Sequence, residues 1–217
     1  MSLATDATSR PIGLYGGSFD PVHLGHLRTA LEVCELLDLE ALRFLPSRLP
    51  PHRDEPRAAA DLRVRMLEAA IADEKRFGVD RRELDRSGAS YTIDTLESLH
   101  EELPGQSFVL ILGMDAFLGL PDWHRAEELA DYTHFMVAHR PGWQAPTTGL
   151  LGSWLAAREV TVPGELATGS GFIYVHPVTA LDISSTAIRE LIAAGSDPRY
   201  LVPEAVRAIL NQSHCYA

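Results

Sequence analysis

Lysine is almost missing from this chain of 217 residues. It occurs once, as Lys75, so arginine supplies all the other basic side chains among the 19. This scarcity excludes a phosphate-binding loop of the Gly-Lys type, in which a lysine reaches the phosphates. It also argues against a lysine that acts as a covalent nucleophile.

Basic charge, cysteine and long apolar runs are also scarce. The formal net charge of −11 argues against a general nucleic-acid or membrane surface, since phosphate backbones need a basic face. Cys34 and Cys215 give neither a disulfide framework nor a metal-binding spacing, so we expect free thiols in a reducing compartment. No stretch reaches the roughly 18 apolar residues of a membrane span, and residues 1–10 are polar. We therefore expect a cytoplasmic protein.

The apolar residues that are present predict one folded unit. A hydrophobic fraction of 46% suffices for one sizeable core, so we expect a single domain over residues 11–217 after a disordered extension, residues 1–10. Strand and helix patterns alternate, which predicts an α/β fold with a Rossmann-like, doubly wound parallel sheet. Strands are expected at 12–15, 41–45, 77–79, 108–112, 134–138 and 172–175, and helices at 26–39, 61–73, 92–103, 185–194 and 203–210. Residues 147–152 and 164–171 are expected to be surface loops.

Residues 16–26, Gly-Gly-Ser-Phe-Asp-Pro-Val-His-Leu-Gly-His, join the first predicted strand to a helix. Gly16 and Gly17 allow the backbone to approach a ligand, and the helix N-terminus directs N–H groups at it. His23 and His26 share one helix face, where imidazoles can donate hydrogen bonds to phosphate oxygens. Either histidine alone is more often a packing or capping residue, but the pair behind two glycines favours phosphate chemistry. A metal site built on this pair lacks a cysteine or a carboxylate partner.

Other polar residues also follow predicted strands. Ligands of open α/β sheets bind at the carboxyl ends of the strands, near the point where the strand order reverses. Arg53 follows the second predicted strand, Gly113 and Asp115 follow the fourth, and Arg140 follows the fifth. Asp115 suits a ribose hydroxyl and equally well a helix cap.

Two further segments carry residues that suit a nucleotide ligand. Ser185 and Thr186 open a predicted helix, and Arg189 follows one turn later, which favours an anion site and equally a plain cap with a solvated arginine. Trp123 suits stacking on an aromatic ring, although a lone tryptophan is more often part of a core. The segment Ser90-Tyr91-Thr92 leads into a predicted helix and suits a plain cap.

The stretch at 16–26 resembles the signature of the nucleotidyltransferase superfamily whose mark is His-x-Gly-His. The sequence Gly-Gly-Ser-Phe-Asp-Pro-Val-His at 16–23 is similar to the corresponding motif of bacterial nicotinate-nucleotide adenylyltransferases. The Ile-Ser-x-Thr-x-Ile-Arg motif at 183–189 also matches that family, whereas class I aminoacyl-tRNA synthetases use a lysine-rich loop. Further motifs agree in order over most of residues 12–211: 77–83, 90–96, 123–125 and 139–142. The match departs at Ala126, where the family often has a second aromatic residue, and over 141–170.

The resemblance implies transfer of the AMP moiety of ATP to nicotinate mononucleotide, which yields nicotinate adenine dinucleotide and pyrophosphate in NAD biosynthesis. His23 and His26 would stabilise the transition state. The ATP contacts implied are Gly16, Gly17, Ser18, Phe19, His23, His26, Gly113, Asp115, Ile183, Ser185, Thr186 and Arg189. The mononucleotide contacts implied are Arg53, Thr92, Trp123, His124 and Arg140. Backbone groups near Thr92 and His124 would receive the nicotinate carboxylate, while Trp123 would stack on the pyridine ring. Mg²⁺ is expected to enter with ATP, and no protein metal ligand is expected.

Two alternatives remain open at this point. An adenylyltransferase for the amide mononucleotide or for phosphopantetheine shares the first motif, but does not explain the segments at 90–92 and 123–124 together. A catalytically idle nucleotide-sensing module is disfavoured by the intact His23, His26 and Arg189. A homo-oligomer is left open.

Overall fold

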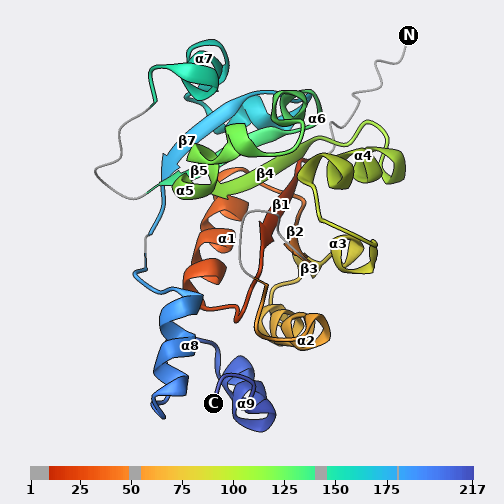
Figure 1. The fold of residues 1–217 in the computed structure, drawn as a ribbon. Helices are drawn as coiled ribbons and strands as arrows, with labels where there is room; N and C mark the ends of the chain where they lie inside the picture. The colour runs from red at the N-terminus through yellow and green to blue at the C-terminus, as the bar shows by residue number, and fades with distance from the viewer. Residues whose placement is uncertain (1–9, 49–54, 140–145, 180) are drawn as a thin grey trace.

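The computed structural model describes residues 10–48, 55–139, 146–179 and 181–217 (Figure 1). In these residues a parallel sheet of seven strands runs in the order β3-β2-β1-β4-β5-β7-β6. The strands are β1 (Ile12–Gly17), β2 (Ala41–Pro46), β3 (Phe77–Val79), β4 (Phe108–Gly113), β5 (His134–His139), β6 (Glu159–Val160) and β7 (Ile173–Pro177). The predicted fold class is confirmed.

Helices cover both faces of this sheet (Figure 1). The α-helices are α1 (Leu24–Leu36), α2 (Ala60–Ile71), α3 (Arg82–Asp85), α4 (Thr92–Glu102), α5 (Met114–Leu118), α6 (Leu129–Tyr132), α7 (Gly149–Arg158), α8 (Ser185–Ala193) and α9 (Glu204–Ser213). Three short 3₁₀ helices are η1 (Leu120–Asp122), η2 (Ala126–Glu128) and η3 (Pro163–Ala167).

The central strand β4 shows why the strands read as continuous apolar runs. Successive side chains of a strand point to opposite faces, and both faces of a parallel sheet are covered by helices. Val109 and Ile111 pack in one core with α1 and α2, whereas Leu110 and Leu112 pack in a second core with α4 and α7. Each strand residue therefore meets a helix, and alternation with polar residues is absent from β4.

The order of the strands places a reversal next to β1. The chain moves outward from β1 to β2 and β3, and then returns to the other side of β1 with β4. The register pairs Tyr15 with Ile111, so Gly17 and Gly113 each lie two residues further toward the carboxyl edge. Ligands of such sheets bind at this edge beside the reversal. The structure thus places the predicted residues after the first and fourth strands on neighbouring strands at this edge.

The region after β5 corrects two sequence predictions. Residues 149–152, expected in a surface loop, begin α7, which buries Leu151 and Trp154 against the sheet. Gly152 weakens the helical pattern in the sequence because glycine has a low helix propensity. The glycine is needed for packing, since a Cβ there would lie 2.4 Å from the carbonyl carbon of Thr147. The second expected loop contains η3, whose Leu166 is fully buried.

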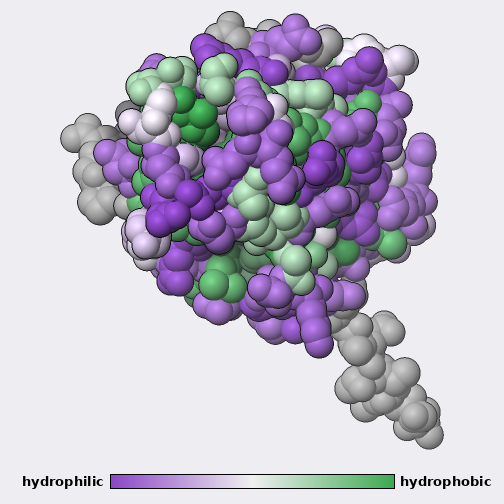
Figure 2. All heavy atoms as spheres, turned by 90° about the horizontal axis from the view of Figure 1, so that it is seen from below, coloured by the Kyte–Doolittle hydropathy of each residue, from purple (hydrophilic) through white to green (hydrophobic). Residues whose placement is uncertain are grey.

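Residues 1–9 fall outside the described residues, and the cytoplasmic location stays a prediction. Within the described ranges, no helix is long and apolar enough to cross a membrane. Cys34 and Cys215 are both free thiols, as predicted. Figure 2 shows that the face seen from below is mostly hydrophilic, with small apolar areas between polar side chains.

Candidate active site

Residues 18–23, which we call the histidine loop, lead from β1 to α1. Gly16 is exposed, and a Cβ added to it would meet no atom within 4 Å, so the end of β1 is open to a ligand. A Cβ on Gly17 would lie 3.1 Å from the ring of Phe19. Phe19, a predicted ATP contact, has only 1% of its surface exposed and packs edge-on against His26 at 5.1 Å. Its side chain therefore supports the site from the core side.

His23 and His26 form a stacked pair at the start of α1. The helix begins at Leu24 and not at His26, so His23 is the capping residue just before it. The two ring centroids are 3.7 Å apart and their planes differ by 25°. The backbone N–H of His23 donates to Nδ1 of His26 at 3.3 Å, so the neutral His26 ring carries its proton on Nε2. The predicted proximity of the two imidazoles is confirmed.

Burial sets the charge of His23. Only 5% of the residue is exposed, and burial lowers the pKa of His23 to about 4, so its ring is neutral near pH 7. Its Nδ1 is buried and has no hydrogen-bond partner among the described residues. A buried ring nitrogen without a partner costs free energy, which a ligand oxygen can recover. His23 would therefore meet a ligand as a neutral imidazole.

Gly25, between the two histidines, is required by close contacts. A Cβ at this position would lie 3.0 Å from Nδ1 of His23 and 3.7 Å from the carbonyl oxygen of Ile183. A side chain there would displace the ring of His23. The contact with Gly25 also places Ile183, a predicted ATP contact, beside the histidines, although at least 157 positions separate them in sequence.

The start of α8 is fastened to the histidine loop. Ser185 donates from Oγ to the carbonyl oxygen of Pro21 at 2.9 Å. Arg189 donates from Nη1 to the carbonyl oxygen of Asp20 at 2.8 Å and from Nη2 to Oγ1 of Thr186 at 3.1 Å. The Nε atom of Arg189 is buried and has no partner in the described part of the chain. The two predicted ATP motifs are therefore in contact. Some of the hydrogen-bond donors of Ser185 and Arg189 hold the histidine loop against α8.

The end of β4 carries two predicted ATP contacts, Gly113 and Asp115, of which Asp115 is predicted to contact the ribose. Gly113 is the last residue of β4 and caps α5, and Asp115 is exposed in the first turn of that helix. Both lie at the carboxyl edge, on the strand next to β1. This placement matches the prediction, while a contact of Asp115 with a ribose stays a prediction.

Thr92 and His124, two of the residues predicted to bind the mononucleotide, lie in neighbouring segments at the start of α4. Thr92 is the first residue of that helix, and the ring of the preceding Tyr91 lies 4.4 Å from the ring of His124. Trp123 is half-buried and lines a hollow of about 360 Å³ together with Arg125. The sequence analysis noted Tyr91 but gave it no role, because a tyrosine before a helix predicts only a cap. Arg53 and Arg140 lie outside the described residues.

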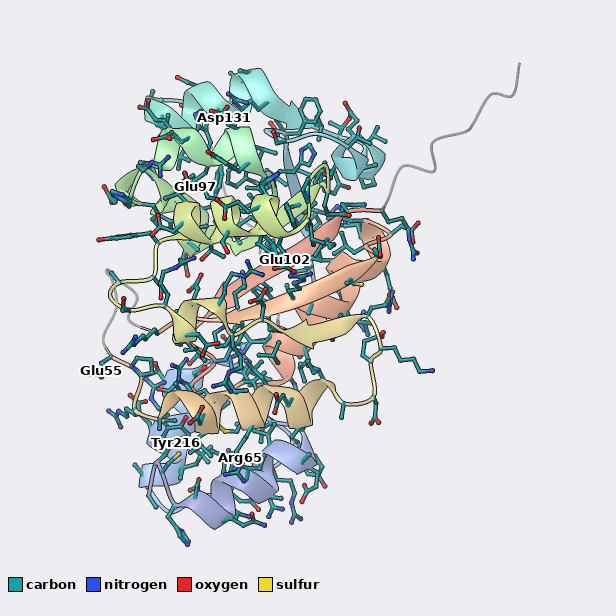
Figure 3. All side chains as sticks on the ribbon, turned by 90° about the vertical axis from the view of Figure 1, so that its right-hand side faces the viewer. Glu55, Arg65, Glu97, Glu102, Asp131 and Tyr216 are labelled. Carbon is teal, nitrogen blue, oxygen red and sulfur yellow. The ribbon has the colours of Figure 1, made fainter. Side chains whose placement is uncertain are left out.

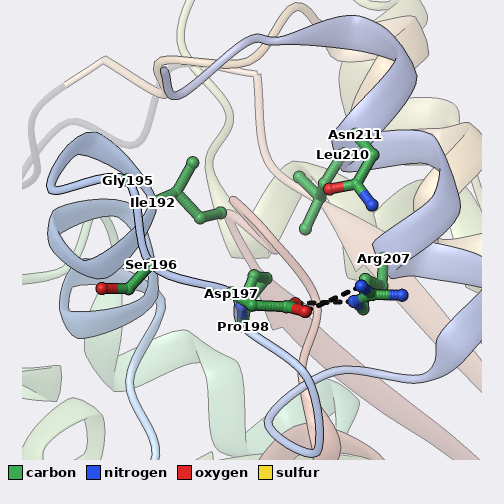
Figure 4. Close-up of a pocket in the computed structure, with 8 residues that line it drawn as sticks. All are labelled: Ile192, Gly195, Ser196, Asp197, Pro198, Arg207, Leu210 and Asn211. Carbon is green, nitrogen blue, oxygen red and sulfur yellow. Dashed lines mark hydrogen bonds and ion pairs between the residues drawn. The ribbon is translucent and has the colours of Figure 1, made fainter.

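A second hollow, of about 290 Å³, lies between the ends of α8 and α9 (Figure 4). Asp197 and Arg207 cross it with an ion pair of 2.6 Å, and Arg207 also bonds Glu204 at 2.7 Å. None of the predicted site residues lines this hollow. Within the described residues, no group of three or more His, Cys, Asp or Glu side chains is arranged to hold a metal ion.

Comparisons with known proteins agree with this geometry. A family model described as cytidylyltransferase-like matches residues 14–191. The chain is 47% identical over 208 residues to a protein of Methylococcus capsulatus named "Probable nicotinate-nucleotide adenylyltransferase", covering 95% of this chain and 99% of that one. A protein of the same name from Pseudomonas syringae pv. tomato is 48% identical, with 95% and 94% covered.

A solved structure has the same fold. The nicotinic acid mononucleotide adenylyltransferase of Plasmodium falciparum, complexed with NaAD, superposes with a TM-score of 0.72 at 17% identity, covering 95% of this chain and 97% of that one. The likeness in fold and the identity to the bacterial relatives both span nearly the whole chain. The chain therefore belongs to the cytidylyltransferase-like family and, within it, to the nicotinate-nucleotide adenylyltransferases.

Proposed function

We propose that this protein transfers the adenylyl group of MgATP to nicotinate mononucleotide, forming nicotinate adenine dinucleotide and pyrophosphate. The observation that carries the proposal is the stacked pair His23 and His26 at the start of α1, with Arg189 fastened beside it. A helix N-terminus, two imidazoles and a guanidinium at the carboxyl edge of a sheet favour a chain of phosphates. The bacterial relatives carry the name of this reaction.

The reaction needs positioning and charge stabilisation more than proton transfer. The 5′-phosphate oxygen of the mononucleotide attacks the α-phosphorus of ATP in line, and the bond from that phosphorus to the β-phosphate oxygen breaks. A phosphate is already a competent nucleophile near pH 7, so no general base is required. His23 and His26 donate hydrogen bonds to phosphate oxygens as negative charge moves onto the leaving pyrophosphate. The neutral state of His23 suits a donor that keeps its proton throughout.

The pyridine end recognises its ligand differently. Backbone N–H groups at Thr92 and His124 receive the nicotinate carboxylate, and Trp123 stacks on the ring. The contact between Tyr91 and His124 supports this assignment, because it brings the two backbone segments together. Arg53 and Arg140 are assigned to the substrate phosphate and ribose from the family resemblance alone.

The donors described at this site do not fit a magnesium ion held by the protein. Mg²⁺ prefers oxygen ligands and keeps several waters, whereas the side chains at the start of α1 are imidazoles. We therefore assign Mg²⁺ to the substrate, as MgATP, with no protein ligand. ATP and the mononucleotide are the partners that this proposal requires.

A panel of substrates tests the proposal. The protein and MgATP are mixed with nicotinate mononucleotide, nicotinamide mononucleotide or phosphopantetheine, and pyrophosphate release is followed. We expect the fastest release with nicotinate mononucleotide. Faster release with either other acceptor would assign the chain to a different adenylyltransferase. Binding of ATP without release in every case would indicate the idle sensing module.

A further inference from the structure

Asp20 belongs to the histidine loop, and its carboxylate contacts the segment before α2, helix α8 and the residues after α9. Only 3% of Asp20 is exposed. Its oxygens accept the backbone N–H groups of Arg57 at 2.8 Å and Ala58 at 3.0 Å, which lead into α2. Arg189 of α8 lies 3.8 Å away, and the hydroxyl of Tyr216 donates to Oδ1 at 2.5 Å. The sequence analysis assigned no role to Asp20 or Tyr216.

The same elements hold the backbone of the histidine loop. The guanidinium of Arg63, which is 2% exposed, donates to the carbonyl oxygen of Ser18 at 2.7 Å. Arg189 and Ser185 hold the next carbonyl oxygens, those of Asp20 and Pro21. His23 follows two residues later. The groups that hold Asp20 therefore also influence the position of the histidine pair.

Tyr216 is not among the predicted substrate contacts. It follows α9, is 5% exposed and packs in the core that contains α2 and α9, where Figure 3 shows it beneath α2. Burial and the adjacent Asp20 carboxylate raise the pKa of the Tyr216 phenol, so the hydroxyl keeps its proton and donates. A buried carboxylate that loses a donor shifts toward its remaining partners. For Asp20, the nearest of these with a full positive charge is Arg189.

We propose that Tyr216 is a positioning residue for phosphate transfer, which acts through its hydrogen bond to Asp20. The inference rests on the proposed function. Without the hydroxyl, Asp20 moves toward Arg189, and the histidine loop moves with it. A displacement of about 1 Å at a reacting group can lower the rate about 100-fold. A smaller displacement of the histidine loop is therefore enough to lower kcat measurably.

The test is Tyr216→Phe, which keeps the ring in the core and removes only the hydroxyl. Tyr200→Phe is the matched control, because Tyr200 lies between α8 and α9 and is 82% exposed. We expect kcat of Tyr216→Phe to fall about 10-fold and that of Tyr200→Phe to stay at the wild-type value. The preference for the acid over the amide mononucleotide should stay unchanged, since Thr92 and His124 belong to other elements. An unchanged kcat in Tyr216→Phe would overturn the inference.

Titration calorimetry with a non-hydrolysable ATP analogue separates positioning from stability. We expect the Kd of Tyr216→Phe to rise about fivefold, the size of one hydrogen bond, at an unchanged stoichiometry. A purely stabilising role would lower the stoichiometry, which counts folded molecules, and leave Kd unchanged. That result would overturn the inference. The binding measurement does not need turnover, so a wild-type protein without pyrophosphate release would contradict the proposed function and leave this test intact.

Discussion

The phosphate end of the site and the pyridine end both lie at the carboxyl edge of the sheet, yet they are held in different ways. At the proposed phosphate end, the buried Asp20 and Arg63 and the partly buried Arg189 tie the histidine loop to α2 and α8. At the pyridine end, Tyr91 and His124 meet through a ring contact, and His124 is exposed.

This difference follows from what each end must do. Donors that stabilise a transition state must be placed before the reaction, because reorganisation during the reaction cancels their benefit. Recognition of a pyridine ring needs a flat surface and a few backbone donors, which a turn can provide. The buried charges of Asp20 and Arg63 lie beside the histidine pair to which the proposed function assigns phosphate transfer. Substitutions at the two ends should accordingly change different kinetic parameters.

The largest expected effect comes from breaking the phosphate end at His26. His26→Ala removes one placed donor and should lower kcat by about 100-fold or more. His100→Ala is the control, because His100 bonds the carbonyl oxygen of Tyr132 on α6. Pyrophosphate release gives kcat, and thermal unfolding shows whether the variants fold. Turnover near the wild-type value in a folded His26→Ala protein would remove His26 from the mechanism.

Arg189→Ala should separate ATP from the mononucleotide. The lost charged hydrogen bond is worth about 1.5 to 3 kcal/mol, so ATP should bind roughly 10- to 150-fold more weakly while the mononucleotide is affected far less. Arg199→Ala is the control, because the Arg199 side chain is 51% exposed and pairs with Asp197. Calorimetry with each ligand alone provides the measurement. Equal weakening of both ligands would show that Arg189 serves only to hold the histidine loop.

The pyridine end can be isolated by its preference for the acid. A carboxamide leaves one backbone donor near Thr92 or His124 unpaired, at a cost of about 1 to 3 kcal/mol, so kcat/KM should favour the acid by roughly 10- to 100-fold. Trp123→Ala should lower kcat/KM for both mononucleotides and leave their ratio nearly unchanged, because stacking does not distinguish the substituents. A ratio near one in the wild type, or a ratio that collapses in Trp123→Ala, would contradict recognition by backbone donors.

The smallest expected effect is the pH dependence of stability that comes from His23, which is buried, unlike His124 at the pyridine end. The pKa of His23 is about 4 in the folded protein, below its ordinary value, so the unfolded chain binds the proton more readily. The free energy of unfolding should therefore fall as pH drops from about 6.5 toward 4, by roughly 1 to 2 kcal/mol between pH 7 and 5.

Urea unfolding of His23→Asn across this pH range measures that contribution. In His23→Asn, the free energy of unfolding should depend on pH less steeply than in the wild type. Some dependence should remain, because burial also lowers the pKa of His134, whose ring bonds the carbonyl oxygen of Thr168. The same slope in the wild type and in His23→Asn would show that His23 does not titrate as a buried group.

The strands and the first motif could be predicted because their signals are local. An apolar run such as 108–112 is typical of a strand inside a covered sheet. The two glycines with His23 and His26 predict a ligand site within eleven residues. The helix at 149–158 escaped prediction because Gly149 and Gly152 weaken its pattern, and the reason for Gly152 is a contact with Thr147 that exists only after folding.

The sequence alone determined the fold class and predicted the chemistry of the site, because hydrophobic periodicity and residue type are properties of short segments. Only the tertiary structure decided how that chemistry is held. Asp20, Arg63 and Tyr216 are separated by as many as 196 positions, and no local pattern pairs them. They meet because a buried carboxylate must collect its donors from whichever elements the packing brings near, and that set exists only in the folded chain.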